Sequence, residues 1–262
     1  MMERDMGIWS SLIRSAGKPK FNSAVLLAAG SGKRFSDDTA KQFAVVGGES
    51  ILVRSAKLFQ SSEDVQEIVV VTRETDIPGV RNILNKAGIT KVTRIVAGGD
   101  TRQESAKIGF DAVNPEADYV AIHDAARCLC TPDMLEAVFE SAFVNGAAAA
   151  ACRNPDTLKR TNGTDLVTET IERENTWRVQ TPQIFKADIY RAASYTCAKE
   201  HFSATDDCAL CEHVGFPVHL VDCGPMNLKI TYPEDTVIAE GILAYRERAA
   251  AEGAKSGKES AT

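Results

Sequence analysis

Hydrophobic residues in this chain form short uninterrupted runs, and stretches with helical spacing lie between them. Residues 23–29 form one such run, and residues 67–72, 91–97 and 118–122 are similar strand-like segments. Apolar runs of this length are typical of strands that are buried on both faces. The stretches with helical spacing are residues 50–59, the segment that ends at Ala87, 101–112 and 132–143.

This alternation predicts an α/β fold with a Rossmann-like, mostly parallel sheet flanked by helices. A further apolar run at 147–151 is interpreted as a buried strand or as tight helix packing. Because crossovers between parallel strands are right-handed, the loops after the strands should meet along one edge of the sheet. Ligands bind at that edge in sheets of this kind.

Residues 154–180 break the alternation. Their sequence, NPDTLKRTNGTDLVTETIERENTWRVQ, places β-branched residues around an Asn-Gly turn signal and contains few residues suited to a core. This pattern predicts a projecting β-hairpin. Since an isolated hairpin is only marginally stable in water, we expect it to pack against something, with a second subunit as the natural candidate.

The remaining organisation follows from composition. Residues 1–21 are interpreted as an N-terminal extension and residues 22–246 as one domain. Residues 247–262 are rich in Ala, Gly, Lys, Glu and Ser. Such a composition predicts a disordered tail.

Charge and cysteine content exclude several classes of protein. The net charge is −6, from 30 Lys and Arg against 36 Asp and Glu, which argues against a general nucleic-acid binder. No segment approaches the roughly 20 apolar residues of a membrane span, and the N-terminus lacks the apolar run of a signal peptide. The seven cysteines are therefore expected to be reduced, and the protein cytoplasmic. Cys208, Cys211 and His213 resemble half a zinc site, but without a second pair small buried residues are the better interpretation.

The segment LLAAGSGKRF at residues 26–35 follows the first predicted strand. It is not a Walker A loop, because Arg34 rather than Ser or Thr follows the lysine, and Phe35 stands where a dinucleotide fingerprint requires its third glycine. Backbone N–H groups of such a loop can wrap a triphosphate, and Arg34 and Lys41 could add positive charge. From this loop alone, a simple glycine turn with solvated basic residues is an equally good interpretation.

Three further segments carry candidate chemistry. Asp124, in HDAAR, ends a predicted strand, and a single carboxylate there suits Mg²⁺; for this motif alone, a helix cap or an ion pair with Arg127 is favoured. In GGDTRQES, residues 98–105, Asp100 and Ser105 could hydrogen-bond a planar base, or Asp100 could cap a helix. In NLKIT, residues 227–231, a lysine in a predicted short strand indicates an anionic partner.

The ordered set of motifs resembles one family. AAGSGKRF, AKQF, GGDTRQES, HDAAR, DTLKR, TIER, TPQ, TDD and NLKIT follow one another between about residues 23 and 244. In this order and spacing they resemble the 2-C-methyl-D-erythritol 4-phosphate cytidylyltransferases of the non-mevalonate isoprenoid pathway. The resemblance implies a nucleotidyltransferase that moves CMP from CTP to methylerythritol phosphate with Mg²⁺ and releases pyrophosphate.

The resemblance also implies roles for individual residues. Arg34, Lys41 and Lys229 would be catalytic, and Asp124 would hold the metal. On the arm, Thr157 and Arg173 would bind the acceptor in the partner subunit of a homodimer, with Arg173 on its phosphate. The nucleotide would be bound by Ala28, Ala29, Gly30, Ser31, Gly32, Gly99, Asp100, Ser105, Ala125 and Arg127.

The sequence departs from the family pattern in three places, because Ala40 and Cys128 stand where proline is expected and Met226 where some members carry aspartate. A ribitol-5-phosphate cytidylyltransferase is the alternative enzyme, although Ala29 and Ala126 favour methylerythritol. A non-catalytic nucleotide-binding subunit is the alternative from another class; such a subunit is expected to have lost Lys41, Asp124 or Lys229.

Overall fold

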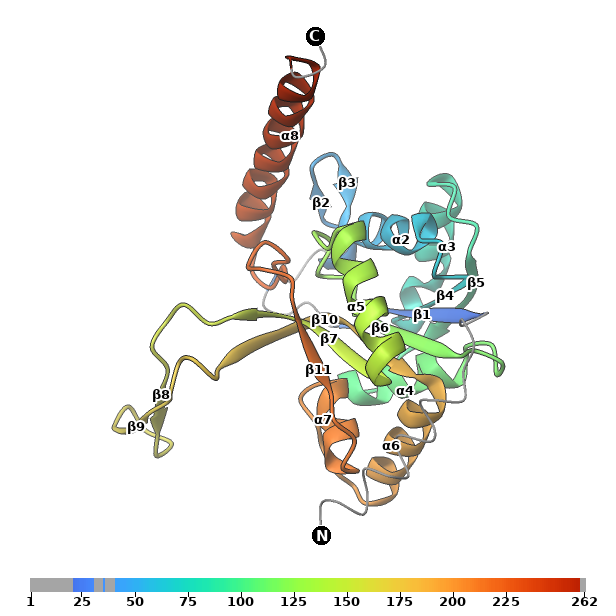
Figure 1. Ribbon diagram of the computed structural model, residues 1–262. Coiled ribbons are helices and arrows are strands. Elements are labelled where there is room, and N and C mark those ends of the chain that lie inside the picture. The colour runs from blue at the N-terminus through green and yellow to red at the C-terminus, as the bar shows by residue number, and fades with distance from the viewer. Residues whose placement is uncertain (1–20, 31–34, 36–40, 260–262) are drawn as a thin grey trace.

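The computed structural model describes residues 21–30, 35 and 41–259, and its centre is a seven-stranded sheet. The strand order is β11-β7-β10-β6-β1-β4-β5, and every neighbouring pair is parallel except the two pairs that β10 makes. The mostly parallel α/β sheet is thus confirmed (Figure 1). Its strands are β1 (Asn22–Leu27), β4 (Glu67–Thr72), β5 (Val92–Ala97), β6 (Tyr119–Asp124), β7 (Ala147–Arg153), β10 (Trp177–Lys186) and β11 (His219–Asp222).

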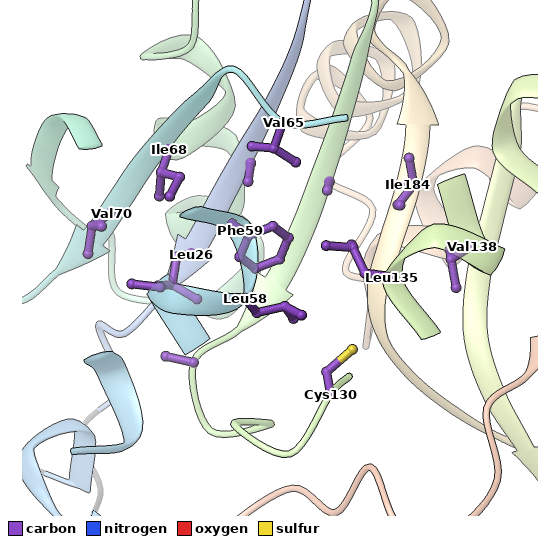
Figure 2. Packing of buried hydrophobic residues seen from close by; sticks show 14 of the residues in the cluster. Leu26, Leu58, Phe59, Val65, Ile68, Val70, Cys130, Leu135, Val138 and Ile184 are labelled. Carbon is purple, nitrogen blue, oxygen red and sulfur yellow. The ribbon is translucent and has the colours of Figure 1, made fainter. Parts of the chain in front are cut away.

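Helices cover both faces of this sheet. One face packs against α2 (Ile51–Ser61), α3 (Ile77–Lys86) and α5 (Pro132–Asn145), and the other against α4 (Arg102–Asp111), α6 (Ala187–Lys199) and α7 (Asp207–His213). Successive residues of a strand point to opposite faces, so Leu26 joins the first core and Val25 the second. Figure 2 shows Leu26 beside Phe59 of α2 in the first core. Burial on both faces explains why β1 and β4 are nearly continuous apolar runs, whereas β5, at the edge of the sheet, is only partly buried.

Local signals set the helix ends. The Ser50 side chain accepts a hydrogen bond from the N–H of Val53 at the start of α2, and Thr101 forms a capping box with Glu104 at the start of α4. Helix α5 begins after Thr131, with proline in its first turn, and ends at Gly146, whose φ is 81°. These are the residue types that satisfy the unpaired backbone groups of helix termini.

Helix α4 lies unusually close to the sheet at Gly109. A Cβ atom at this position would lie 2.4 Å from Cγ1 of Val25 and 2.7 Å from Cγ2 of Val71. We expect Gly109→Ala to lower the free energy of unfolding by about 2 kcal/mol, because overpacking outweighs the gain in helix propensity. Urea denaturation measures this. Gly241→Ala is the control, since a Cβ there meets nothing within 4 Å and should stabilise the protein slightly; a stabilising Gly109→Ala would contradict the packing.

The predicted projecting hairpin is present, but it is shorter than expected. Strands β8 (Lys159–Thr161) and β9 (Val167–Thr170) pair antiparallel and extend away from the sheet (Figure 1). Residues 177–180 were assigned to this arm by the sequence, whereas they begin β10 and pair with β7. The first three of these residues are half-buried or exposed, so this end of β10 lacks the continuous apolar pattern of the core strands.

Two further expectations are wrong. The tail predicted to be disordered from residue 247 is helical to Glu259, as the end of α8 (Asp235–Glu259), because Ala, Glu, Lys and Arg favour helix. Residues 227–231 form no strand and instead cross the end of the sheet, with the N–H of Ile230 bonded to the carbonyl of Ala126. In the described part of the chain, no helix combines the length and apolar character needed to cross a bilayer. Residues 1–20 of the predicted extension lie outside the described residues.

Candidate active site

A cavity of about 570 Å³ lies at the edge of the sheet where β1 and β6 end. The two strands are parallel neighbours, and Asp124, the last residue of β6, is directly opposite Leu27, the last residue of β1. The cavity is therefore at the carboxyl edge, where the sequence analysis expects a ligand. The predicted site residues that line it are Ala28, Ala29, Gly30, Lys41, Gly99, Asp100, Ser105, Asp124, Ala125 and Lys229.

Two glycine-containing segments meet on one side of this cavity. A Cβ on Gly98 would lie 2.6 Å from the Cβ of Ala29 and 2.7 Å from Oγ of Ser105, so only glycine fits between them. The Ser105 hydroxyl, which is buried, accepts a hydrogen bond from the N–H of Gly99 at 3.2 Å. The tight packing brings the loop after β1 and the start of α4 to the same cavity wall. Ser31, Gly32 and Arg34, which belong to the predicted loop site, lie outside the described residues.

The alternative helix-capping role of Asp100 is wrong, because Thr101 is the N-cap of α4. Thr101 accepts a hydrogen bond from the N–H of Glu104, and Glu104 in turn accepts from the N–H of Thr101. Asp100, exposed, stands just before this cap and lines the cavity. Its carboxylate is therefore placed where it can meet a ligand, and its part in reading a base stays a prediction.

The Asp124 carboxylate is paired with two cations. Nε of Arg102 donates to Oδ1 at 3.0 Å, and Nζ of Lys229 donates to Oδ2 at 2.5 Å. Burial alone would raise the pKa of Asp124, but the charges of Arg102 and Lys229 outweigh it and hold this pKa well below its ordinary value. The ion pair with Arg127 that the sequence analysis considered is not formed.

The Arg127 side chain instead links two other segments of the chain through hydrogen bonds. Its Nη1 donates to the carbonyl of Asn227 at 2.8 Å, and its Nη2 to the carbonyl of Val179 at 3.4 Å. The fully buried Asn227 donates from Nδ2 to Oε1 of Gln180 and to the carbonyl of Thr181. These hydrogen bonds hold the segment that contains Lys229 against β10. Arg127 does not line the cavity, so its predicted contact with the nucleotide gains no support from the geometry.

Lys41 reaches the cavity from a short 3₁₀ helix, η1 (Lys41–Phe43). The next residue, Gln42, is buried and donates from Nε2 to Oδ2 of Asp76 at 2.8 Å. Asp76 also accepts from Nε of Arg73 at 2.7 Å. These hydrogen bonds hold η1 against the start of α3. They therefore fix the backbone position of Lys41.

Thr157 and Arg173 do not line the cavity of their own chain. Both are exposed on the arm, where Nη1 of Arg173 donates to the carbonyl of Pro155 at 3.2 Å. Figure 1 shows the arm extending away from the sheet that carries the cavity. Within a single chain the structure therefore does not bring these two residues together with the others.

Sequence reasoning missed four polar residues that line the cavity, namely Gln42, Thr101, Arg102 and Thr231. Each stands inside a motif already singled out: KQF, GGDTRQES and NLKIT. The signal was therefore present, but the side chains of Gln42 and Arg102 depend on partners far away in the sequence. Arg102, for example, joins Asp124 to Asp207, which lies 105 residues further on.

The donor set at Asp124 is compatible with Mg²⁺. No cluster of three or more acidic, His or Cys ligands occurs in the described part of the chain, but Mg²⁺ in phosphate sites is held by one or two carboxylates plus phosphate oxygens and water. Asp124 supplies one ionised carboxylate at the cavity wall. Lys229, which occupies Oδ2, would have to give way to the ion.

His123, the neighbour of Asp124, is a buried structural residue. Nδ1 lies 3.1 Å from the Thr181 hydroxyl, which itself accepts from the N–H of Asp124. Nδ1 and the hydroxyl thus share a hydrogen bond, and the ring packs edge-on against Phe59. Burial lowers the pKa of His123 to about 4.

This burial makes stability depend on pH. The unfolded chain binds a proton at His123 below pH 6.5 and the folded chain only below about pH 4, so stability is lost as the pH falls between these values. We expect the free energy of unfolding at pH 5 to be about 2 kcal/mol lower than at pH 8 from this residue alone. Urea titrations should show that His123→Asn removes this part of the difference. The exposed His219→Asn should keep all of it, and equal pH dependence in the two variants would contradict the assignment.

Comparisons with known proteins agree with this geometry. The family model for 2-C-methyl-D-erythritol 4-phosphate cytidylyltransferase matches residues 23–245. The enzyme of that name from Halalkalibacterium halodurans is 38% identical over 226 residues, 86% of this chain and 98% of the relative. The one from Geotalea uraniireducens is 40% identical over 224 residues, 84% of this chain and 96% of the relative.

Solved structures give the same result. The crystal structure of 4-diphosphocytidyl-2C-methyl-D-erythritol synthase from Anaerococcus prevotii superposes with a TM-score of 0.77 at 28% identity, over 86% of this chain and 96% of that one. The 2-C-methyl-D-erythritol 4-phosphate cytidylyltransferase from Thermus thermophilus gives 0.69 at 29% identity, over 84% and 98%. Sequence and fold agree over nearly the whole domain, and the chain belongs to the 2-C-methyl-D-erythritol 4-phosphate cytidylyltransferase family of nucleotidyltransferases.

Proposed function

We propose that the protein transfers CMP from CTP to 2-C-methyl-D-erythritol 4-phosphate, giving 4-diphosphocytidyl-2-C-methyl-D-erythritol and pyrophosphate. The observation that carries this proposal is the composition of one cavity wall. Lys41, Lys229 and Arg102 line it together with Asp124 and the glycine segment after β1. A triphosphate needs this combination of cations and open backbone N–H groups, and family membership supplies the reaction.

The chemistry is a displacement at the α-phosphorus of CTP. An oxygen of the acceptor phosphate forms the new bond, and the bond between the α-phosphorus and the oxygen that bridges to the β-phosphate breaks. The acceptor phosphate is already ionised at neutral pH, so no general base is needed. Negative charge builds on the oxygens around the α-phosphorus, and the ammonium groups of Lys41 and Lys229 are the described cations best placed to offset it.

Asp124 is the residue that would hold Mg²⁺. When bound, the ion would supply positive charge that offsets the charge on the departing pyrophosphate. The role of the protein's own residues is to keep the Asp124 carboxylate ionised at the cavity wall. Arg102 and Lys229 do this by holding the pKa of Asp124 low.

The acceptor half of the site comes from a second copy of the chain. Thr157 and Arg173 project on an arm that does not fold back over its own cavity. The arm also carries exposed Leu166 and Val167, which a partner would cover. A homodimer in which each arm reaches the other cavity explains both features, with Arg173 on the acceptor phosphate.

The protein acts in the cytoplasm, on small molecules rather than on nucleic acid. All seven cysteines are free and buried in the structure, which suits a reducing compartment. The net charge is −6, and three cations, Lys41, Arg102 and Lys229, line the cavity.

The test is pyrophosphate release from CTP and Mg²⁺, with methylerythritol phosphate and ribitol 5-phosphate offered separately. Release with methylerythritol phosphate alone is expected, and nothing in the comparisons favours ribitol 5-phosphate. Release with ribitol 5-phosphate alone would overturn the acceptor. Tight CTP binding in calorimetry without turnover on either acceptor would instead favour a non-catalytic nucleotide-binding subunit.

A further inference from the structure

Five side chains form a continuous chain of hydrogen bonds from the buried core to the cavity. The Tyr190 hydroxyl donates to Oδ1 of Asp207 at 2.7 Å, and Nη1 of Arg102 donates to Oδ2 of the same carboxylate at 2.7 Å. Arg102 then reaches Oδ1 of Asp124 through Nε at 3.0 Å, and Lys229 bonds the other oxygen of Asp124. Charges of opposite sign alternate along this chain.

The two cations on Asp124 are held very differently. The Asp207 side chain, 1% exposed, would be a buried unpaired charge without Arg102, which is a strongly unfavourable state. The N–H of Asp207 is itself fixed by Oε1 of Gln183 at 3.0 Å. Lys229 has no such anchor on its ammonium among the printed contacts of the described residues, and its side chain is 38% exposed. If Lys229 leaves, Asp124 is still paired; if Arg102 leaves, two carboxylates lose a partner.

We propose that Arg102 is a positioning residue that fixes the Asp124 carboxylate through Oδ1, so that Oδ2 is the oxygen left for exchange. Lys229 occupies Oδ2 in the free protein and leaves it when a divalent cation and the phosphates of the nucleotide bind. Arg102 starts α4, directly after the segment that is predicted to read the base. It therefore also fixes the distance between that segment and the carboxylate. For catalysis this inference rests on the proposed function; for cation binding it does not.

The test uses a double variant that removes both charges of the anchor. Arg102→Gln with Asp207→Asn leaves the net charge unchanged and leaves no unpaired buried charge. Lys107→Gln with Asp111→Asn is the matched control, since it neutralises an exposed ion pair on the same helix. The first readout is Mn²⁺ binding to the nucleotide-free protein, followed by the loss of the free-ion EPR signal. The second is the split between kcat and KM for CTP.

The double variant is expected to bind Mn²⁺ about 10- to 100-fold more weakly, as for other changes behind a metal ligand. Its kcat should fall by a similar factor, while KM for CTP changes less than about threefold. The reason is that the Asp124 carboxylate loses its orientation but CTP still binds. Lys229→Gln should bind Mn²⁺ more tightly, since the competitor for Oδ2 is gone. The control should match the unaltered protein in all of these measurements.

Unchanged Mn²⁺ affinity and kcat, with only a lower melting temperature, would overturn the proposal and leave the anchor purely structural. Absence of Mn²⁺ binding by the unaltered protein at millimolar concentrations would also overturn it. Should the double variant fail to fold, Arg102→Lys keeps a cation for Asp207 but cannot span both carboxylates, and the same loss is expected. If the unaltered protein transfers no CMP, the proposed function fails while the Mn²⁺ comparison still decides this point.

Discussion

Replacing Lys229 with glutamine should lower kcat for CMP transfer by about 10²- to 10³-fold, the usual effect of removing one donor aimed at developing charge. The Lys229 ammonium lines the cavity and is exchangeable, because Asp124 keeps Arg102 when it leaves. Glutamine can still donate a hydrogen bond, but it carries no charge to offset that on the α-phosphorus. Steady-state kinetics with saturating CTP and acceptor measure this directly.

Folding should survive this change. The backbone around Lys229 is held by its neighbours, through Asn227 on β10 and the N–H of Ile230 on Ala126, and not by the ammonium group. The melting temperature should therefore stay within a few degrees of that of the unaltered protein. Lys57→Gln is the control, since this lysine is about half exposed on α2 and pairs only with Glu49 among the printed contacts of the described residues. A kcat within twofold of the unaltered protein would exclude Lys229 from the chemistry.

The sequence predicted best those elements whose pattern is imposed by burial. Strand β4 was predicted with its exact bounds, because both of its faces are covered and every residue is buried. Strand β10 was missed at residues 177–180, because its first three residues are only half-buried or exposed and do not form an apolar run. Helix α8 was missed beyond residue 246 because an Ala- and Glu-rich segment has the same composition whether it is a solvated helix or a disordered tail.

The residues of the site also differ in how well the sequence predicted them. The sequence placed Asp124 at the end of a buried strand, and the structure shows that Asp124 ends β6 and lines the cavity; its contact with a ligand stays a prediction. That Arg102 rather than Arg127 is its partner could not be predicted, because it depends on how α4 and α7 dock on one face of the sheet. The short spacing between Asp124 and Arg127 suggested an ion pair, whereas the tight turn after β6 directs Arg127 to two carbonyl groups.

Mixing two inactive variants should restore activity if the arm completes the site of the partner. Arg173→Ala removes the predicted acceptor contact from the arm, and Lys229→Gln damages the cavity; each alone should have little activity. After random exchange of subunits, half of the dimers are mixed, and each mixed dimer has one site with neither change. The expected recovery is therefore about a quarter of the activity of the unaltered protein.

The control tests whether the recovery depends on combining an altered arm with an altered cavity. Mixing Lys229→Gln with Lys41→Ala should restore nothing, because both changes lie in the cavity wall and every site keeps one of them. Native mass spectrometry confirms that mixed dimers have formed. Mixed dimers without recovery would mean that each arm serves its own cavity, which requires the arm to leave the projecting position it has in the structure. Recovery would place Arg173 and Lys229 in one site although they belong to different chains, and would make the dimer a condition for catalysis.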